Sequence, residues 1–320
     1  MPQFVQVDSG AAALRVAVEG QGPLVVLVHG FPESWFSWRH QMGPIADAGF
    51  TAAAIDVRGY GGSDKPQVIE AYAMEALTAD VAGVARALQP HAPAILVGHD
   101  WGAPIVWNTA LSRPDAIAAV AALSVPYLGV PQRSFRAWFD EMFTSRNRFF
   151  YQAWFQQVGP PEAEAEADVR GFLRKFYYGI SGDAPAGSWP QKTADATLLD
   201  GLVDPNPFPA WMTENELDYY VSEFRGSGFR GPLNLYRNHD ADFAWMQGFK
   251  DRRIEQPALF ITGTKDPAFN FAGHADPIEV MRGVVPNLQG AHVLEGCGHW
   301  TQQERVREVN DLIIPWLKAL

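Results

Sequence analysis

An acidic residue stands where a sharp turn in the chain would expose a reactive side chain. Asp100 is the middle residue of Gly98–Gly102 (Gly-His-Asp-Trp-Gly), which directly follows the apolar run 94–97. Glycines on both sides permit a crowded turn from a buried strand into a helix, with the middle side chain at the end of the sheet. A serine at such a turn attacks acyl carbons, whereas a carboxylate is suited to displacement at an sp³ carbon and forms an alkyl ester. The pattern therefore indicates opening of an epoxide ring or displacement of a halide.

Two later residues have the types and positions needed to support this nucleophile. His299 is flanked by glycine-rich sequence just after the strand-like run 291–294, and Asp266 follows the run 258–262. A carboxylate can hold an imidazole in the tautomer that accepts a proton from water. We therefore predict His299 as the base and Asp266 as its orienting acid. Asp242 and Asp276 follow no strand-like run and are weaker candidates for that acid.

The backbone after the first apolar run is predicted to stabilise negative charge. His29–Pro32 (His-Gly-Phe-Pro) follows the run 24–28, and Pro32 restricts the shape of this loop. An oxyanion forms when the ester on Asp100 is hydrolysed, and backbone N–H groups are suitable donors to it. We predict that the N–H groups of Phe31 and Trp101 form this oxyanion hole.

These residues need a sheet that brings the ends of distant strands together. Continuous apolar runs alternate with helix-like stretches in the first 126 residues, which indicates βαβ units and a parallel sheet covered on both faces. The runs lie at 24–28, 51–55, 94–97 and 118–123, and the helix-like stretches at 35–48, 74–88 and 103–112. The fold class predicted from this pattern is α/β, with a mostly parallel central sheet flanked by helices.

The alternation stops after Pro126 and returns only near residue 258. Residues 127–246 are rich in aromatic side chains and have helix-like stretches without strand-like runs, and 182–209 reads as a long loop because of its glycine, proline and aspartate content. We therefore predict an α/β core made of residues 1–126 and 247–320, interrupted by a helical cap at 127–246.

Composition narrows the class of protein. The chain has 320 residues, 47% hydrophobic and 19% charged, so it can bury a large core. Its formal net charge of −11 argues against nucleic acid as a partner. No apolar run approaches the roughly 18 residues of a membrane span, and no signal peptide is visible. The single cysteine, Cys297, excludes an internal disulfide and favours the cytoplasm.

Four motifs together resemble the soluble epoxide hydrolases of the α/β-hydrolase fold. They are HGFPESW at 29–35, DVRGYGGS at 56–63, GHDWG at 98–102 and GHW at 298–300. The order Asp100, Asp266, His299 is also the α/β-hydrolase order, with aspartate in place of serine. The resemblance spans about residues 24–316; Pro267, directly after Asp266, departs from it. It implies hydrolysis of an epoxide to a vicinal diol through an ester on Asp100.

The resemblance also implies two tyrosines in the cap that activate the epoxide oxygen. Tyr151, in FYQAWF, and Tyr236, in PLNLYRN, match the two lid motifs. An alkoxide is a poor leaving group unless a phenol donates to it, so the requirement is chemically reasonable. No cofactor is needed, and no histidine cluster resembles a metal site. The aromatic cap favours an apolar substrate, with an aryl epoxide as one candidate.

Other functions remain open on the sequence alone. A haloalkane or haloacid dehalogenase would share the Asp100 nucleophile, and the indole of Trp101 could hold its halide. A non-catalytic ligand-binding protein on the same fold could lose the triad, which this chain keeps. The two lid phenols favour the epoxide. The sequence leaves open the natural epoxide, the carbon attacked and whether copies of the chain form a homo-oligomer.

Overall fold

A single mixed sheet runs through the computed structural model, which describes residues 2–270 and 276–320. Its eight strands follow the order β1-β2-β4-β3-β5-β6-β7-β8. They are β1 (Gln3–Asp8), β2 (Ala13–Gly20), β3 (Leu24–Val28), β4 (Thr51–Ile55), β5 (Ala94–His99), β6 (Ile117–Leu123), β7 (Ala258–Gly263) and β8 (Leu288–Leu294). β2 pairs antiparallel with β1 and β4, and all pairs from β4 to β8 are parallel. The mostly parallel sheet predicted from the sequence is confirmed.

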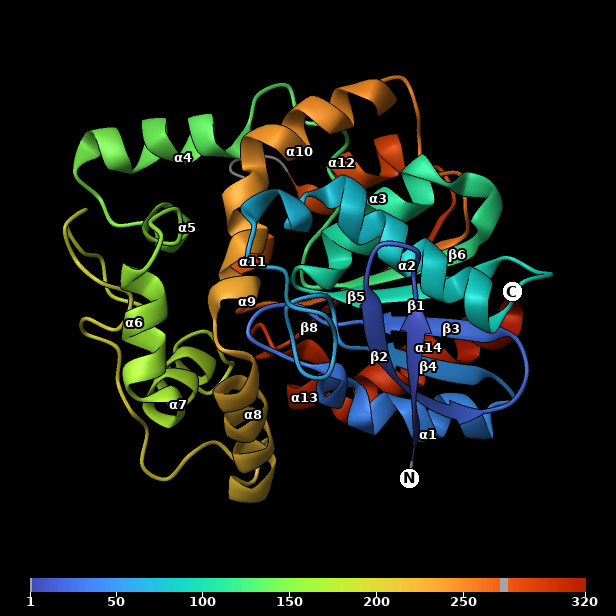
Figure 1. Cartoon of the computed structure of the whole chain (residues 1–320), viewed down its shortest axis with the longest axis horizontal. Coiled ribbons are helices and arrows are strands. Elements are labelled where there is room, and N and C mark those ends of the chain that lie inside the picture. Colours follow the sequence, from blue (N-terminus) through green and yellow to red (C-terminus); the bar gives the residue numbers. More distant parts are fainter. Residues whose placement is uncertain (1, 271–275) are drawn as a thin grey trace.

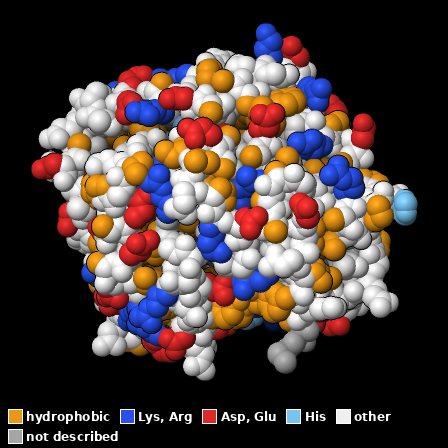
Figure 2. All heavy atoms as spheres, in the orientation of Figure 1, with side chains coloured by type: hydrophobic (Ala, Val, Ile, Leu, Met, Phe, Trp, Pro, Cys, Tyr) orange, Lys and Arg blue, Asp and Glu red, His pale blue; other side chains and the backbone are white. Residues whose placement is uncertain are grey.

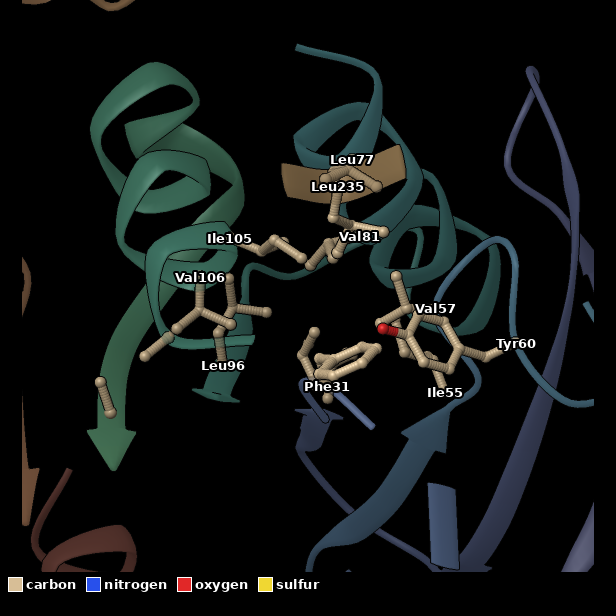
Figure 3. Close-up of a cluster of buried hydrophobic side chains, with 14 of the residues drawn as sticks. Phe31, Ile55, Val57, Tyr60, Leu77, Val81, Leu96, Ile105, Val106 and Leu235 are labelled. Carbon is tan, nitrogen blue, oxygen red and sulfur yellow. The ribbon is translucent and has the colours of Figure 1, made fainter. Parts of the chain in front are cut away.

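Both faces of the parallel strands are covered, which explains their continuous apolar sequences. Successive residues of a strand point to opposite faces. Val26 and Leu96 accordingly pack with α2 (Met74–Leu88) and α3 (Gly102–Ser112). Figure 3 shows Leu96 in one cluster with Val81 of α2 and Val106 of α3. Val25 and Val97 pack on the other face with α1 (Arg39–Asp47) and α14 (Val306–Ala319). Burial on both sides fixes the strands and thereby the loops at their carboxyl ends.

The segment between β6 and β7 contributes helices and no strand. Its α-helices are α4 (Phe135–Met142), α5 (Tyr151–Trp154), α6 (Pro160–Ala167), α7 (Val169–Gly179), α8 (Glu214–Ser227), α9 (Arg230–Asn234) and α10 (His239–Met246). Figure 1 shows most of this segment to the left of the sheet. Residues 180–213 contain neither helix nor strand, in agreement with the predicted loop. The apolar cluster that contains Val26 and Leu96 continues from the sheet into these helices through residues such as Phe172 and Leu217.

Short elements complete the chain. They are η1 (Trp35–Trp38), η2 (Ile69–Tyr72), η3 (Pro114–Ala116), η4 (Thr144–Arg146), η5 (Leu235–Asn238), η6 (Gln247–Phe249), α11 (Pro267–Asn270), α12 (Pro277–Val284) and α13 (Thr301–Glu304). Acidic and basic side chains are interspersed over the face of the molecule in Figure 2, so no broad patch of one sign covers it. Among the described helices, none has the length and apolarity needed to cross a bilayer.

Candidate active site

The turn between β5 and α3 holds Asp100 in a strained conformation. Its φ of 50° lies in the left-handed region, which non-glycine residues seldom adopt. A Cβ added to Gly98 would lie 2.2 Å from the carbonyl oxygen of Gly102, and one on Gly102 would lie 2.0 Å from that of Val28. Both glycines are therefore required for the close approach of β5, α3 and β3. The turn leaves the Asp100 side chain at the carboxyl edge of the sheet.

The two carboxylate oxygens of Asp100 have different neighbours. The backbone N–H of Phe31, in the loop after β3, donates to Oδ1 at 2.6 Å. Nε2 of His299 lies 3.2 Å from Oδ2. A Cβ built on Gly30 would lie 2.3 Å from Oδ1 and 2.6 Å from the backbone nitrogen of Trp101, so both atoms face the space that this glycine leaves open. The geometry brings both predicted oxyanion-hole residues to the nucleophile.

Asp266 lies on the opposite side of the His299 ring. Its Oδ1 is 2.9 Å from Nδ1 of His299, and its side chain is fully buried after β7. Pro267 opens α11, where a missing N–H costs nothing, and the N–H of Ala268 donates to Oδ1 of Asp266 at 2.9 Å. The departure from the family pattern at Pro267 thus leaves Asp266 anchored against His299.

The two other candidate acids lie elsewhere. Oδ1 of Asp242 accepts the N–H of Met74 at 2.7 Å, at the start of α2. Asp276 accepts the N–H of Ile278 at 2.9 Å and caps α12. Both carboxylates satisfy helix N-termini, which is a common structural role for aspartate.

Electrostatics favour a charged imidazole in the resting site. Burial alone would lower the pKa of His299, but the carboxylates of Asp266 and Asp100 raise it well above its usual range. The resting site therefore favours an imidazolium between two carboxylates. Conversion of Asp100 to a neutral ester would remove one of these charges and favour the neutral ring that a base requires.

The two tyrosines predicted to act from a lid lie next to each other near Asp100. Tyr151 begins α5 and Tyr236 lies in η5, with ring centroids 6.0 Å apart. The Tyr236 ring packs edge to face against Phe31 at 5.4 Å and Trp101 at 5.1 Å. Burial, followed by the charge of Asp100, raises the pKa of both phenols above the usual range. Both are therefore neutral hydrogen-bond donors at ordinary pH.

Two cavities reach Asp100. One, of about 590 Å³, is lined by Asp100, His299, Tyr151 and Tyr236, together with apolar residues such as Trp189. The other, of about 510 Å³, also includes Asp100 and Tyr151 and extends past Trp138. A third, open depression of about 1000 Å³ near Arg113 includes none of the predicted site residues. The reactive carboxylate can thus contact a ligand with substituents on either side.

A buried polar chain behind the site was not assigned a role from the sequence. Glu33 accepts the N–H of Gly30 at 3.0 Å and lies 2.7 Å from Nδ1 of His99. Nε2 of His99 lies 2.8 Å from the carbonyl oxygen of His299. Burial raises the pKa of Glu33, but His99 and the Gly30 N–H lower it to about 2, so it is ionised. These contacts connect the loop after β3, the turn between β5 and α3, and the loop that carries His299. Glu33 and His99 both lie inside the motifs identified in the sequence.

Comparison with known proteins identifies the family. A family model described as alpha/beta hydrolase fold matches residues 23–160. Epoxide hydrolase A of Mycobacterium tuberculosis is 40% identical, and the match covers 98% of this chain and 97% of that protein. The structure of an epoxide hydrolase from an endophytic Streptomyces has a TM-score of 0.93 and 44% identity, covering 100% of this chain and 95% of the other. Epoxide Hydrolase A from Mycobacterium thermoresistibile has a TM-score of 0.93 and 39% identity, covering 100% and 99%. With this similarity over nearly its whole length, the chain belongs to the epoxide hydrolases of the α/β-hydrolase fold.

Proposed function

We propose that this protein converts an epoxide and water to a vicinal diol through an alkyl ester on Asp100. The observation that carries the proposal is the setting of one carboxylate. Asp100 accepts the Phe31 N–H, has the His299 imidazole within 3.2 Å, and lines a cavity together with both lid phenols. Nucleophile, base and proton donors thus surround one space.

In the first half-reaction Asp100 attacks a carbon of the epoxide. A new C–O bond forms to the carboxylate as the ring C–O bond breaks and its electron pair moves to the ring oxygen. Tyr151 and Tyr236 hydrogen-bond to that oxygen, and a phenol supplies the proton that completes the hydroxyl group. Both phenols are neutral donors because burial and the nearby carboxylate raise their pKa values. The product of this step is a hydroxyalkyl ester of Asp100. The tyrosinate left behind recovers a proton from the His299 imidazolium, which becomes the neutral base of the next step.

In the second half-reaction water attacks the carbonyl carbon of that ester. His299, oriented by Asp266, accepts a proton from the water, and the N–H groups of Phe31 and Trp101 stabilise the oxyanion. Collapse of the tetrahedral intermediate breaks the bond between the carbonyl carbon and the alkoxy oxygen, which takes the second proton of the attacking water. The diol leaves and Asp100 is regenerated as a carboxylate.

The substrate proposed is an apolar epoxide, including aryl epoxides. Both cavities that reach Asp100 carry aromatic side chains, among them Trp189 in one and Trp138 in the other. We also propose that residues 127–246 form the cap over the α/β core. Tyr151, Tyr236 and both tryptophans lie in this segment, between β6 and β7, and line the cavities that reach Asp100. A cytoplasmic location, favoured by the single cysteine, belongs to the same proposal.

Product analysis with a panel of epoxides and alkyl bromides tests the assignment. We expect diol formation from epoxides by the wild-type protein and none by Asp100→Ala. Asp276→Asn is the matched control, since it removes an exposed carboxylate that caps α12, and should retain activity. Bromide release without diol formation would favour a dehalogenase, whose halide the indole of Trp101 could bind. Equal diol formation by Asp100→Ala would exclude the covalent mechanism.

A further inference from the structure

A hydrogen-bond chain connects one lid tyrosine to a buried histidine. The side-chain amide nitrogen of Gln152 donates to the hydroxyl oxygen of Tyr151 at 2.8 Å. Nε2 of His239 lies 2.9 Å from Oε1 of the same glutamine. Tyr151 and Gln152 begin α5, whereas His239 begins α10, directly after the η5 segment that carries Tyr236. The chain therefore joins the two segments of the polypeptide that carry the lid tyrosines.

The direction of the hydrogen bonds decides where the Tyr151 proton can go. An amide oxygen only accepts, so the His239 nitrogen that faces Oε1 of Gln152 must carry a proton. The amide nitrogen of Gln152 then donates to Tyr151, which leaves the phenolic proton available to the ring oxygen of the substrate. With the amide reversed, its oxygen would accept the phenolic proton instead.

The His239 ring is held in place from several sides. It stacks on the indole of Trp101, with centroids 6.1 Å apart and an interplanar angle of 18°, and packs edge to face against Phe135 at 5.3 Å and Phe139 at 5.9 Å. Burial, the largest cause, lowers its pKa to about 4; the charge of Asp240 raises the pKa by a smaller amount, and that of Arg136 lowers it further. The imidazole is therefore neutral at ordinary pH, and its one proton can reside on the nitrogen that faces Gln152.

The donor from Gln152 also acts on the acidity of the phenol. Burial and then the charge of Asp100 raise the pKa of Tyr151, and the hydrogen bond from Gln152 works in the opposite direction. A donor to the phenolic oxygen stabilises the negative charge that grows there as its proton shifts to the substrate. Gln152 thus leaves the phenolic proton of Tyr151 free to point toward the substrate and favours its transfer there.

We propose that Gln152 and His239 are positioning residues that hold the Tyr151 hydroxyl as a proton donor toward the epoxide oxygen, with His239 fixing the orientation of the Gln152 amide. The proposal rests on the proposed function, because it assigns Tyr151 to the alkylation of Asp100. His239 also stacks on Trp101 and lines the second cavity. The part of its effect that passes through Gln152 is therefore the part that depends on the Tyr151 hydroxyl.

Two substitutions of Gln152 separate its functions. Gln152→Met keeps the approximate length of the side chain and removes the donor. Gln152→Glu keeps the shape, but its carboxylate accepts from both His239 and Tyr151 and withdraws the phenolic proton from the substrate. Gln247→Met is the matched control, since Gln247 donates to the carbonyl of Pro131 at 3.0 Å and lines neither cavity that reaches Asp100.

The measurement is the single-turnover rate at which styrene oxide alkylates Asp100. It is made in the wild-type and Tyr151→Phe backgrounds. Loss of one hydrogen bond corresponds to a rate reduction of about ten-fold. We expect about that reduction for Gln152→Met, a larger one for Gln152→Glu, and no change for Gln247→Met. Ester hydrolysis should keep its wild-type rate in all three. With Tyr151→Phe already present, neither substitution at Gln152 should slow alkylation further by more than about two-fold.

A second pair of variants tests His239. His239→Gln retains an N–H near the position of Nε2 and should keep alkylation within about three-fold of wild type. His239→Leu loses the donor and should match Gln152→Met, again only when the Tyr151 hydroxyl is present.

The outcomes distinguish this proposal from the function on which it rests. Absence of any Asp100 ester in the wild-type protein would overturn the proposed function. Normal ester formation with wild-type rates in both Gln152 variants would overturn the positioning role alone. Equal slowing of alkylation by these variants in the presence and absence of the Tyr151 hydroxyl would also overturn it, because a general packing defect does not depend on that hydroxyl.

Discussion

Nε2 of His299 lies 3.2 Å from Oδ2 of Asp100, although the two residues are 199 positions apart in the chain. The contact exists because β5 and β8 both end at the same edge of the sheet. Asp100 directly follows β5, and His299 lies in the loop after β8. It leaves the other oxygen, Oδ1, to the Phe31 N–H. In the proposed mechanism the imidazole is thus close enough to direct a water molecule onto the carboxyl carbon of Asp100 once that group is esterified.

Replacement of the base should separate the two half-reactions. His299→Gln keeps a polar side chain of similar reach but cannot accept a proton from water. Asp100 should still be alkylated, and the ester should accumulate because its hydrolysis is blocked. Mass spectrometry of the intact variant after mixing with an epoxide should reveal an adduct with the full mass of the substrate. Absence of the adduct, with substrate binding intact, would remove His299 from the hydrolytic step.

The lid phenols should affect the first half-reaction only. Tyr151→Phe and Tyr236→Phe preserve the ring packing and remove one donor each, so each should slow alkylation on the order of 10²-fold. The double variant should be nearly inactive, and the Michaelis constants of the single variants should stay within a few-fold of wild type. Stopped-flow measurement of alkylation tests this. Wild-type epoxide turnover in all three variants would contradict the roles assigned to these two tyrosines.

Hydrolysis of the ester should increase with pH until His299 is neutral. In the free enzyme, burial opposes but the carboxylates of Asp266 and Asp100 together raise the pKa of His299 well above its usual range. Esterification neutralises Asp100 and removes one of those charges. The midpoint of the hydrolysis rate should therefore lie below the pKa of His299 in the free enzyme. Single-turnover hydrolysis as a function of pH, compared with NMR titration of the His299 ring, measures both; an equal or higher midpoint would contradict the account.

The nucleophile turn should not tolerate a side chain at Gly98. A Cβ there would lie 2.2 Å from the carbonyl oxygen of Gly102, so Gly98→Ala forces the backbone apart. We expect a loss of about 1–3 kcal/mol in the free energy of unfolding. Gly43→Ala is the control, because Gly43 lies inside α1 with no atom within 4 Å of the added Cβ. It should be neutral or stabilising by about 0.5–1 kcal/mol in urea unfolding. Equal stability of the two variants would contradict the steric argument.

The parallel strands could be predicted because they are buried on both faces. β3 and β4 begin and end where their apolar runs do, and β5 extends its run by two residues. β1 and β2 were not predicted, since they lie at the antiparallel edge of the sheet and alternate buried with more exposed residues. Sequences such as that of Gln3–Asp8 contain no continuous apolar run, so their place depends on pairing with distant strands.

Local sequence indicated the candidate site because its main residues follow strands directly. Asp100 follows β5 and Asp266 follows β7, and parallel strands deliver such residues to one edge. The connection of Glu33 to His99 and that of Gln152 to His239 could not be predicted in this way. Each joins side chains on separate elements, and no local pattern specifies how α5 lies against α10.

Isotope labelling of a single turnover tests the central claim most directly. With excess enzyme in ¹⁸O-water, the attacking water adds to the carbonyl carbon of the Asp100 ester, so its oxygen stays in the enzyme. The account predicts ¹⁸O in the peptide that contains Asp100 and none in the diol from that first turnover. Incorporation of ¹⁸O into the diol, with an unlabelled Asp100, would mean that water opens the epoxide directly and would contradict the covalent mechanism.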